Sequence, residues 1–258
     1  MFTAITREVS PAIAACELTH IAREPIDLAR ARAQHRAYER ALADAGGSVE
    51  RLDATAEMPD AVFVEDIAVV FDEVALITRP GAPSRRVETP AVAAALAAHR
   101  PLAAIEAPAT VDGGDVLVAG RDVFVGLSTR TNDEAVVQME RILGPFGYQV
   151  HATAVRGCLH LKSAATALDA STLLVNRERI DPCAFARFAL VDVDPREPEA
   201  ANALRLGDRV VFPSAFPRTA DRLANCGYRL AIVDASELAK AEGAVTCCSL
   251  IVARQEGR

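Results

Sequence analysis

The sequence predicts an α/β protein in which five units, each a strand hairpin followed by a helix, close into a ring. Strand pairs alternate with helical patterns along the whole chain, and the polar residue that opens each pair recurs after 46, 48, 42 and 45 residues. Internal periods of this length are typical of units that stack or close into a circle. The positions that define these intervals are Asp66, Asp112, His160, Asn202 and Cys247. An ordinary α/β sheet has the same alternation and stays an alternative.

The helices are predicted from an apolar stripe and from their capping residues. The first stripe comprises Leu28, Ala31, His35, Tyr38, Leu42 and Ala45, at a spacing that buries one helix face. His35 is therefore expected to be a packed core residue. Later helix starts are marked by capping side chains, twice followed by proline, at Thr89-Pro90, Asn132-Asp133, Asp181-Pro182 and Thr219. Glycines mark helix ends at Gly46-Gly47, Gly144-Pro145 and Gly227.

A predicted hairpin precedes each later helix, and its first strand opens with polar residues. Four such hairpins occupy residues 64–80, 112–130, 159–176 and 199–218. The fifth would join "TCCSLIVAR" (246–254) to the N-terminal "FTAITR" (2–7). A ring would direct the leading polar residues of all five units toward one axis, so a cysteine near the end of the chain can be central.

Composition excludes several classes of partner. The chain has 258 residues, 51% of them hydrophobic, which is enough for a large core in one domain spanning 1–258. With 28 basic and 35 acidic residues the net charge is -7, which excludes a nucleic-acid or anionic-membrane footprint and favours small cationic partners. Neither a signal peptide nor a membrane helix is predicted, so a cytoplasmic location is expected. The six cysteines form no CxxC pair and are expected to be thiols.

The residues predicted at the axis suggest a cysteine enzyme. Taken alone, a cysteine is more often an inert buried thiol, and a histidine between two leucines is more often a core residue. Their recurrence at equivalent points of successive units favours function. In such a set Cys247 would attack, His160 would move protons and Asp112 would hold His160.

The additional carboxylates indicate a cationic target. Glu65, Asp66 and Asp112 near one axis would repel an oxyanion and attract a planar guanidinium, which carboxylates bind bidentately. Its charge would also lower the pKa of the attacking thiol. In a strand Cys247 and Cys248 would face opposite sides, and the local pattern does not decide which one faces the axis.

Six motifs in register carry a family resemblance over nearly the whole chain. They are "PDAVFVED" (59–66), "ITRPGAPSRR" (77–86), "DGGDVL" (112–117), "RTN" (130–132), "LHLKS" (159–163) and "GAVTCCSL" (243–250). With these motifs the chain resembles the dimethylarginine dimethylaminohydrolases of the guanidine-modifying pentein superfamily. The resemblance implies a five-bladed α/β propeller of ββαβ-like modules with pseudo-fivefold symmetry. Residue 112 is glutamate in some relatives and aspartate here, so its distance to His160 is open.

The resemblance also implies residue roles and a reaction. Cys247 would be the nucleophile, His160 the general acid and base, and Asp112 its partner. The implied substrate-binding residues are Leu18, Asp60, Phe63, Glu65, Asp66, Arg85, Arg130 and Val245. Arg85 and Arg130 would bind the substrate α-carboxylate, and Asp60 and Leu18 would lie near its α-amino group. Dimethyl- or monomethylarginine would be hydrolysed to citrulline and an amine through a covalent thiouronium, with no metal or organic cofactor. The oligomeric state is left open, and a homodimer is one of the candidates.

Three alternatives stay open on the same residues. Hydrolysis of citrulline, or an arginine deiminase reaction, would use the same groups, although the chain is short for the inserted helical domain of arginine deiminases. A non-catalytic binding propeller, like the ribosome anti-association factors that share this fold, would not need the cysteine, histidine and acid set. A zinc site could use Cys158, His160 and Cys247 or Cys248, but the spacing matches no structural zinc pattern.

Overall fold

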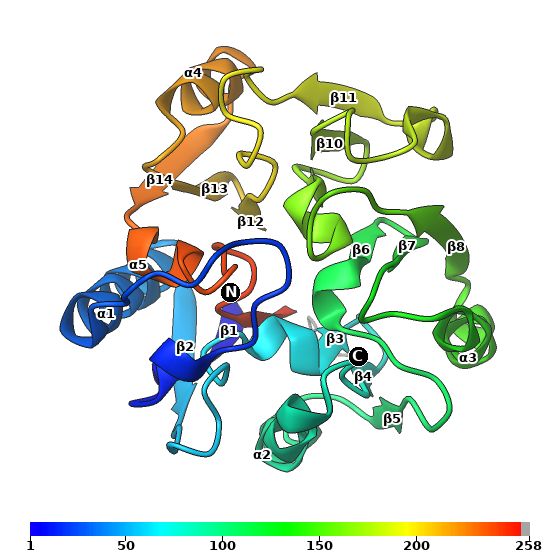
Figure 1. Ribbon diagram of the computed structural model, residues 1–258. Coiled ribbons are helices and arrows are strands. Elements are labelled where there is room, and N and C mark those ends of the chain that lie inside the picture. The colour runs from blue at the N-terminus through cyan, green and yellow to red at the C-terminus, as the bar shows by residue number, and fades with distance from the viewer. Residues whose placement is uncertain (254–258) are drawn as a thin grey trace.

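Five three-stranded sheets surround a common axis in the computed structural model, which describes residues 1–253 (Figure 1). In every sheet an inner strand pairs antiparallel with the middle strand, which pairs parallel with the outer strand. This repeated order gives the molecule its pseudo-fivefold symmetry and confirms the predicted ring of five units. A single domain spanning 1–258 extends beyond the described residues and stays a prediction.

We call each sheet with its helix a blade, and give the strands from the axis outward. The first blade consists of β15 (Leu250–Ala253), β1 (Phe2–Arg7), β2 (Gly47–Leu52) and α1 (Leu28–Asp44). The second consists of β3 (Ala68–Val70), β4 (Ala75–Ile77), β5 (Leu102–Ala104) and α2 (Thr89–Ala97). The third consists of β6 (Val116–Ala119), β7 (Asp122–Leu127), β8 (Gln149–Ala154) and α3 (Asp133–Leu143).

The fourth blade carries a 3-10 helix in place of an α-helix, and the fifth carries an α-helix of the same length as α2. The fourth consists of β9 (Ala165–Ala167), β10 (Thr172–Val175), β11 (Ala189–Asp192) and a short 3-10 helix, Pro182–Phe185. The fifth consists of β12 (Leu204–Leu206), β13 (Arg209–Pro213), β14 (Arg229–Val233) and α4 (Pro217–Asn225), and α5 (Ser236–Ala239) follows it. None of the described helices is long and apolar enough to cross a membrane.

Helices α1 to α4 lie on the outside of the ring (Figure 1). The Asp27 side chain caps α1 by accepting from the Arg30 N–H at 3.0 Å, and the predicted stripe faces the core. His35 is buried as predicted, and burial lowers the pKa of its imidazole to about 4. This histidine is neutral and structural.

The capping predictions hold at two helix starts and fail at the other two. Thr89 is the first residue of α2 and not its N-cap, and its hydroxyl donates to the Arg86 carbonyl oxygen. Asn132 accepts from the Ala135 N–H, and Asp181 accepts from the Cys183 N–H, as N-caps do. Helix α4, in contrast, begins at Pro217, and Thr219 is a buried residue inside it whose hydroxyl accepts from the Asp194 N–H. Proline favours the first helical turn, so the helix starts three residues earlier than a cap at Thr219 would place it.

The ring closes through the first blade, where the two end segments of the chain pair. β1 and β15 run antiparallel with Phe2 opposite Ala253 and Ile5 opposite Leu250, which confirms the predicted fifth hairpin. Arg254, its last predicted residue, lies outside the described residues. Inner strands of neighbouring blades contact one another, as β15 contacts β3 and β6 contacts β9. The segments that lead into the inner strands, which we call the hub, therefore meet around the axis.

Candidate active site

A small cavity lies at the hub, where three 3-10 helices and one turn lead into inner strands. The helices are Val64–Ile67, Gly113–Asp115 and Leu161–Ser163. Eight of the eleven predicted site residues line this cavity: Asp60, Phe63, Asp66, Arg85, Asp112, Arg130, His160 and Cys247. The free volume among them is only about 20 Å³, which is room for about one water molecule. A substrate as large as an amino acid therefore requires side chains or a loop to move.

Three predicted residues do not line the cavity. Leu18 is half-buried and packs against the core of the first blade, while its neighbour Glu17 lines the cavity. Val245 is buried in the same core. Glu65 points into a second cavity. Sequence reasoning missed five lining residues, namely Glu17, Leu159, Ala241, Glu242 and Gly243; each is within a few residues of a recognised motif or of Leu18.

His160 lies between two buried carboxylates. Its Nε2 is 3.2 Å from Asp112 Oδ2, and its Nδ1 is 3.8 Å from Asp66 Oδ1. Asp112 therefore reaches His160, which answers the question raised by the shorter aspartate side chain. Burial alone would lower the pKa of His160, but Asp66, Asp115 and Asp112 outweigh it and raise the pKa to about 9. At neutral pH the imidazole is protonated and can act as an acid.

The "DGGD" motif lets these groups approach closely. A Cβ atom on Gly114 would lie 2.5 Å from His160 Nδ1 and 2.8 Å from Asp66 Oδ1. A Cβ atom on Gly113 would lie 2.0 Å from the Glu65 carbonyl oxygen. Real Cβ contacts are not this short, so only glycine fits at both positions.

The substitution Gly114→Ala should displace His160 or Asp66. We expect kcat for the cavity's reaction to fall by about 100-fold, the order of loss that a misplacement of 1 Å causes. The matched control is Gly144→Ala, because Gly144 has nothing within 4 Å of a built Cβ and a φ of -52°. Steady-state kinetics of both variants would check this, and equal activity of the two would contradict it.

Asp112 and Asp115 fix the backbone around His160. Asp112 Oδ1 accepts from the Gly81 N–H at 2.8 Å, so this side chain is held at both oxygens. Asp115 accepts from Ser128, Thr131 and the Leu161 N–H, each within 2.9 Å. Burial raises the pKa of Asp115, partly offset by His160 and these bonds. Asp115 thus supports the segment that carries His160.

The two adjacent cysteines have different surroundings. Both lie in a turn before β15, and not in a strand, so the predicted strand alternation does not apply. Cys247 is half-buried and lines the cavity, whereas Cys248 is buried in the first-blade core with its Sγ 3.4 Å from the Ala244 carbonyl oxygen. Burial, and then the charges of Glu65 and Asp66, raise the pKa of the Cys247 thiol well above its usual value. The thiol is therefore protonated until a cation arrives.

Arg85 occupies the cavity with its own guanidinium. Its Nη1 is 2.5 Å from Asp66 Oδ2, and its Nε and Nη2 bind the Glu88 carboxylate at 3.1 and 3.0 Å. Burial alone would raise the pKa of Asp66, but His160 and Arg85 outweigh it and lower the pKa. Asp66 is therefore an ionised carboxylate that already binds a guanidinium.

The segment around Leu18 is held over the cavity by several contacts. Glu242, a non-glycine residue with a φ of 57°, accepts from the Thr19 and His20 N–H groups at 2.7 Å. Asp60 accepts from the Glu17 N–H at 3.2 Å, and Arg130 donates to the Thr19 hydroxyl at 3.1 Å. Burial raises the pKa of Asp60 to about 6, although Arg85 partly opposes it. The same residues thus bound the cavity and hold the segment that covers it.

The cysteines proposed as zinc ligands are not brought together. Cys158 is buried, with its Sγ 3.4 Å from the His160 carbonyl oxygen, and it lines a cavity other than that of Cys247. Within residues 1–253 the one group of potential ligands is Asp66, Asp112 and His160. Arg85 and a backbone N–H already bind Asp66, so these oxygens serve the protein itself.

Comparisons with known proteins show which chains this one is similar to. A family model described as "N,N dimethylarginine dimethylhydrolase, eukaryotic" matches residues 17–182. The chain is 42% identical over 249 residues to the N(G),N(G)-dimethylarginine dimethylaminohydrolase of Streptomyces coelicolor, covering 96% of this chain and 95% of the relative. It is 38% identical over 226 residues to the enzyme of that name from Pseudomonas aeruginosa, covering 87% and 89%.

Solved structures share the fold. A cysteine-to-serine variant of the Pseudomonas aeruginosa enzyme in complex with citrulline superposes with a TM-score of 0.90 at 35% identity, covering 97% of this chain and 99% of that one. The N-terminal domain of an arginine dihydrolase from cyanobacteria has a TM-score of 0.87 at 17% identity, covering 98% of both chains, and shows the fold alone. The five-bladed α/β propeller implied by the motifs is confirmed.

Proposed function

Because the chain belongs to the dimethylarginine dimethylaminohydrolase family, we propose that it hydrolyses dimethyl-L-arginine, and the monomethyl compound, to citrulline and an amine. The observation that carries the proposal is one cavity lined by a thiol, a protonated imidazole and several carboxylates: Cys247, His160, Asp66 and Asp112. Carboxylates repel an oxyanion and bind a guanidinium. The reacting group is thus a cation, and the chain is a hydrolase of the guanidino group.

The first half of the reaction forms a covalent intermediate. The substrate cation, held by Asp66, stabilises the thiolate of Cys247, which otherwise has a raised pKa. The sulfur attacks the guanidinium carbon and forms a C–S bond. His160 then donates its proton to the dimethylamine nitrogen, the C–N bond breaks, and a thiouronium remains on Cys247.

The second half uses His160 as a base. After the amine leaves, the neutral imidazole accepts a proton from water, and the oxygen attacks the thiouronium carbon. The C–S bond breaks, the thiolate of Cys247 leaves and citrulline is released. Asp112 keeps the imidazole in place through both steps, and no step requires a metal or an organic cofactor.

Binding of the substrate requires Asp66 to exchange one guanidinium partner for another. Asp66 already binds Arg85, so the substrate guanidinium competes with this side chain. Arg130 is half-buried and donates only to Thr19 among the described contacts, which makes it available for the α-carboxylate. Asp60, next to the covering segment, suits the α-amino group. We assign Phe63 to the cavity wall.

A substrate panel tests the proposal. The protein would be incubated with asymmetric dimethylarginine, arginine and citrulline, and dimethylamine, ammonia and ornithine would be measured. We expect dimethylamine and citrulline in equal amounts from the first compound. Ammonia from arginine without dimethylamine release would overturn the substrate assignment in favour of a deiminase, and ornithine from citrulline would indicate a citrulline hydrolase.

A further inference from the structure

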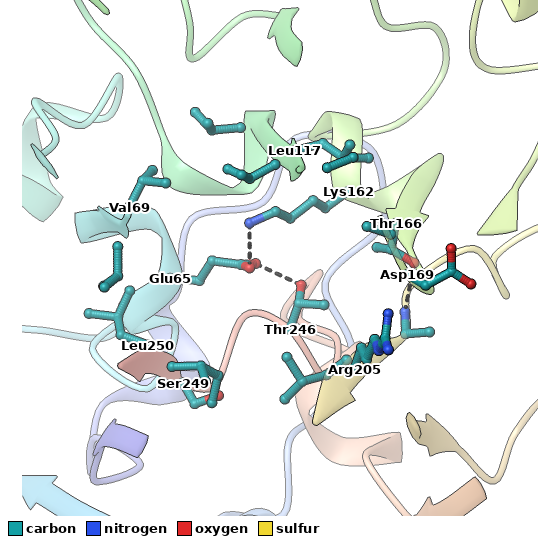
Figure 2. A pocket seen from close by; sticks show the side chains of 18 of the residues that line it. Glu65, Val69, Leu117, Lys162, Thr166, Asp169, Arg205, Thr246, Ser249 and Leu250 are labelled. Atoms are coloured by element: carbon teal, nitrogen blue, oxygen red, sulfur yellow. Dashed lines mark hydrogen bonds and ion pairs between the residues drawn. The ribbon is translucent and has the colours of Figure 1, made fainter. Parts of the chain in front are cut away.

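A second, larger cavity lies along the axis, enclosed by the five inner strands. Its volume is about 540 Å³, and residues of β3, β6, β9, β12 and β15 all line it. It shares no lining residue with the candidate active site. Glu65, Lys162 and Thr246 reach into it from different blades and are joined by hydrogen bonds and an ion pair (Figure 2). We call it the axial cavity.

A closed set of hydrogen bonds separates the two cavities. Lys162 Nζ is 2.7 Å from Glu65 Oε1 and 3.2 Å from the Gly113 carbonyl oxygen. The Thr246 hydroxyl donates to Glu65 Oε2 at 2.7 Å. Asn202 donates to the Thr246 hydroxyl at 2.8 Å and to the Lys162 carbonyl oxygen at 3.1 Å, and accepts from the Thr246 N–H at 3.0 Å. These five residues, one from each blade, are the hub ring.

The hub ring is attached to the residues that line the active site. Four of its members are one or two positions from such a residue, in the pairs Glu65 and Asp66, Gly113 and Asp112, Lys162 and His160, and Thr246 and Cys247. The Glu65 N–H also donates to the Cys247 carbonyl oxygen at 3.1 Å. A shift of the ring therefore shifts the thiol relative to the imidazole, and misplacements of this kind are costly in catalysis.

The hub ring also contributes charged groups close to the Cys247 thiol. Four titratable groups interact electrostatically with the Cys247 thiol: Glu65 and Asp66 from the 3-10 helix before β3, Cys248 from the same turn, and Tyr38 from α1. Two more, His160 and Asp112, line the same cavity. After burial, Glu65 is the largest cause of the raised thiol pKa. Lys162 is the cation bound to Glu65. The chain has only two lysines, and this one is at the hub.

We propose that Lys162 is a positioning residue for the reaction: it fixes the hub ring behind Cys247 and His160, and it offsets the charge of Glu65 that opposes thiolate formation. This inference rests on the proposed function, in which the thiolate attacks. Removing the ammonium leaves the buried carboxylate of Glu65 without its cation behind the thiol, so the thiolate becomes harder to form. Removing the carboxylate alone has the opposite electrostatic effect.

Three variants test the proposal: Lys162→Met, Glu65→Gln and the double variant. We expect the rising limb of kcat against pH, which reports the thiol in the substrate complex, to move up by about one pH unit in Lys162→Met and down in Glu65→Gln. The double variant has a neutral pair of similar shape, with the Thr246 acceptor kept, and should return to within about threefold of the wild type. A merely structural lysine would give no such opposite shifts and no recovery.

Alkylation of Cys247 by iodoacetamide gives a readout that needs no substrate. Its rate against pH, with the site identified by mass spectrometry, reports thiolate formation and should shift in the same directions. If the wild type hydrolyses none of the panel compounds, the proposed function fails, while the alkylation profiles still decide the role of Lys162. If Lys162→Met does not fold, a downward shift in Glu65→Gln that disappears in the double variant supports the proposal.

The other lysine is the matched control. Lys240 also pairs with a glutamate, Glu237, at 2.8 Å, but Lys240 is partly exposed after the end of α5 and neither residue lines either cavity. Lys240→Met makes the same change in net charge and should leave both pH profiles unchanged. Unshifted profiles in the Glu65 and Lys162 variants, or losses that add in the double variant, would overturn the proposal.

Discussion

Replacing Cys247 with serine should lower kcat for dimethylarginine by at least about 1,000-fold, because removing the nucleophile removes the covalent step. Cys248→Ser should stay within about threefold of wild type, since its sulfur faces the Ala244 carbonyl oxygen and the first-blade core. The second substitution should instead lower the free energy of unfolding by about 1 kcal/mol, the typical cost of changing a buried side chain. Comparing the two variants therefore shows which of the two neighbouring thiols is the nucleophile.

The measurement is citrulline formation by both variants, with denaturant unfolding to compare their stabilities. Calorimetric binding of dimethylarginine to Cys247→Ser would show that its cavity is intact. Full turnover by this variant would exclude the covalent thiouronium on Cys247 and assign the catalysis to other groups. Loss of activity in Cys248→Ser alone would show that Cys248, and not Cys247, is the nucleophile.

Replacing His160 with glutamine should lower kcat by about 100- to 10,000-fold, the usual range for a lost general acid and base. In the wild type, kcat, which reports the complex in which the substrate cation has lowered the thiol pKa, should fall as pH rises through about 9. The sign follows from the raised pKa of His160: the imidazolium is present below about pH 9 and is lost above it, and with it the proton for the leaving amine.

Kinetics over pH 6 to 11, with an NMR titration of His160, would check this prediction. His151 is the matched control, because this half-exposed histidine pairs with Asp122 at 2.9 Å on β7 and β8, away from the hub. His151→Gln should retain full activity. A falling limb near the ordinary histidine value of about 6.5 would mean that Asp66, Asp115 and Asp112 do not stabilise the imidazolium.

The ring of five units was predictable because its signals are periodic and local. The spacing from Asp66 to Cys247 reports the repeat itself, and the caps at Asn132 and Asp181 are interactions with residues two or three positions away. The prediction failed at Thr219, where proline at residue 217 competes for the helix start.

Contacts across the axis could not be predicted from spacing. Glu65 and Asp66 are adjacent, yet one side chain binds Lys162 behind the site and the other faces His160 within it, because a 3-10 helix turns successive side chains apart. The pairing of Arg85 with Asp66 joins residues that only folding brings together, whereas Glu88 is three positions from Arg85 in the same 3-10 helix. Motifs thus locate the site, while packing decides what each side chain faces.

The pairing of Phe2 with Ala253 affects when the candidate active site forms during folding. The first blade needs strands that are some 250 residues apart in the chain, so the turn before β15, which carries Cys247, is held in place by a contact between distant parts of the chain. Contacts of such long sequence separation form slowly. We therefore expect the thiol of Cys247 to reach the imidazole of His160 late in folding.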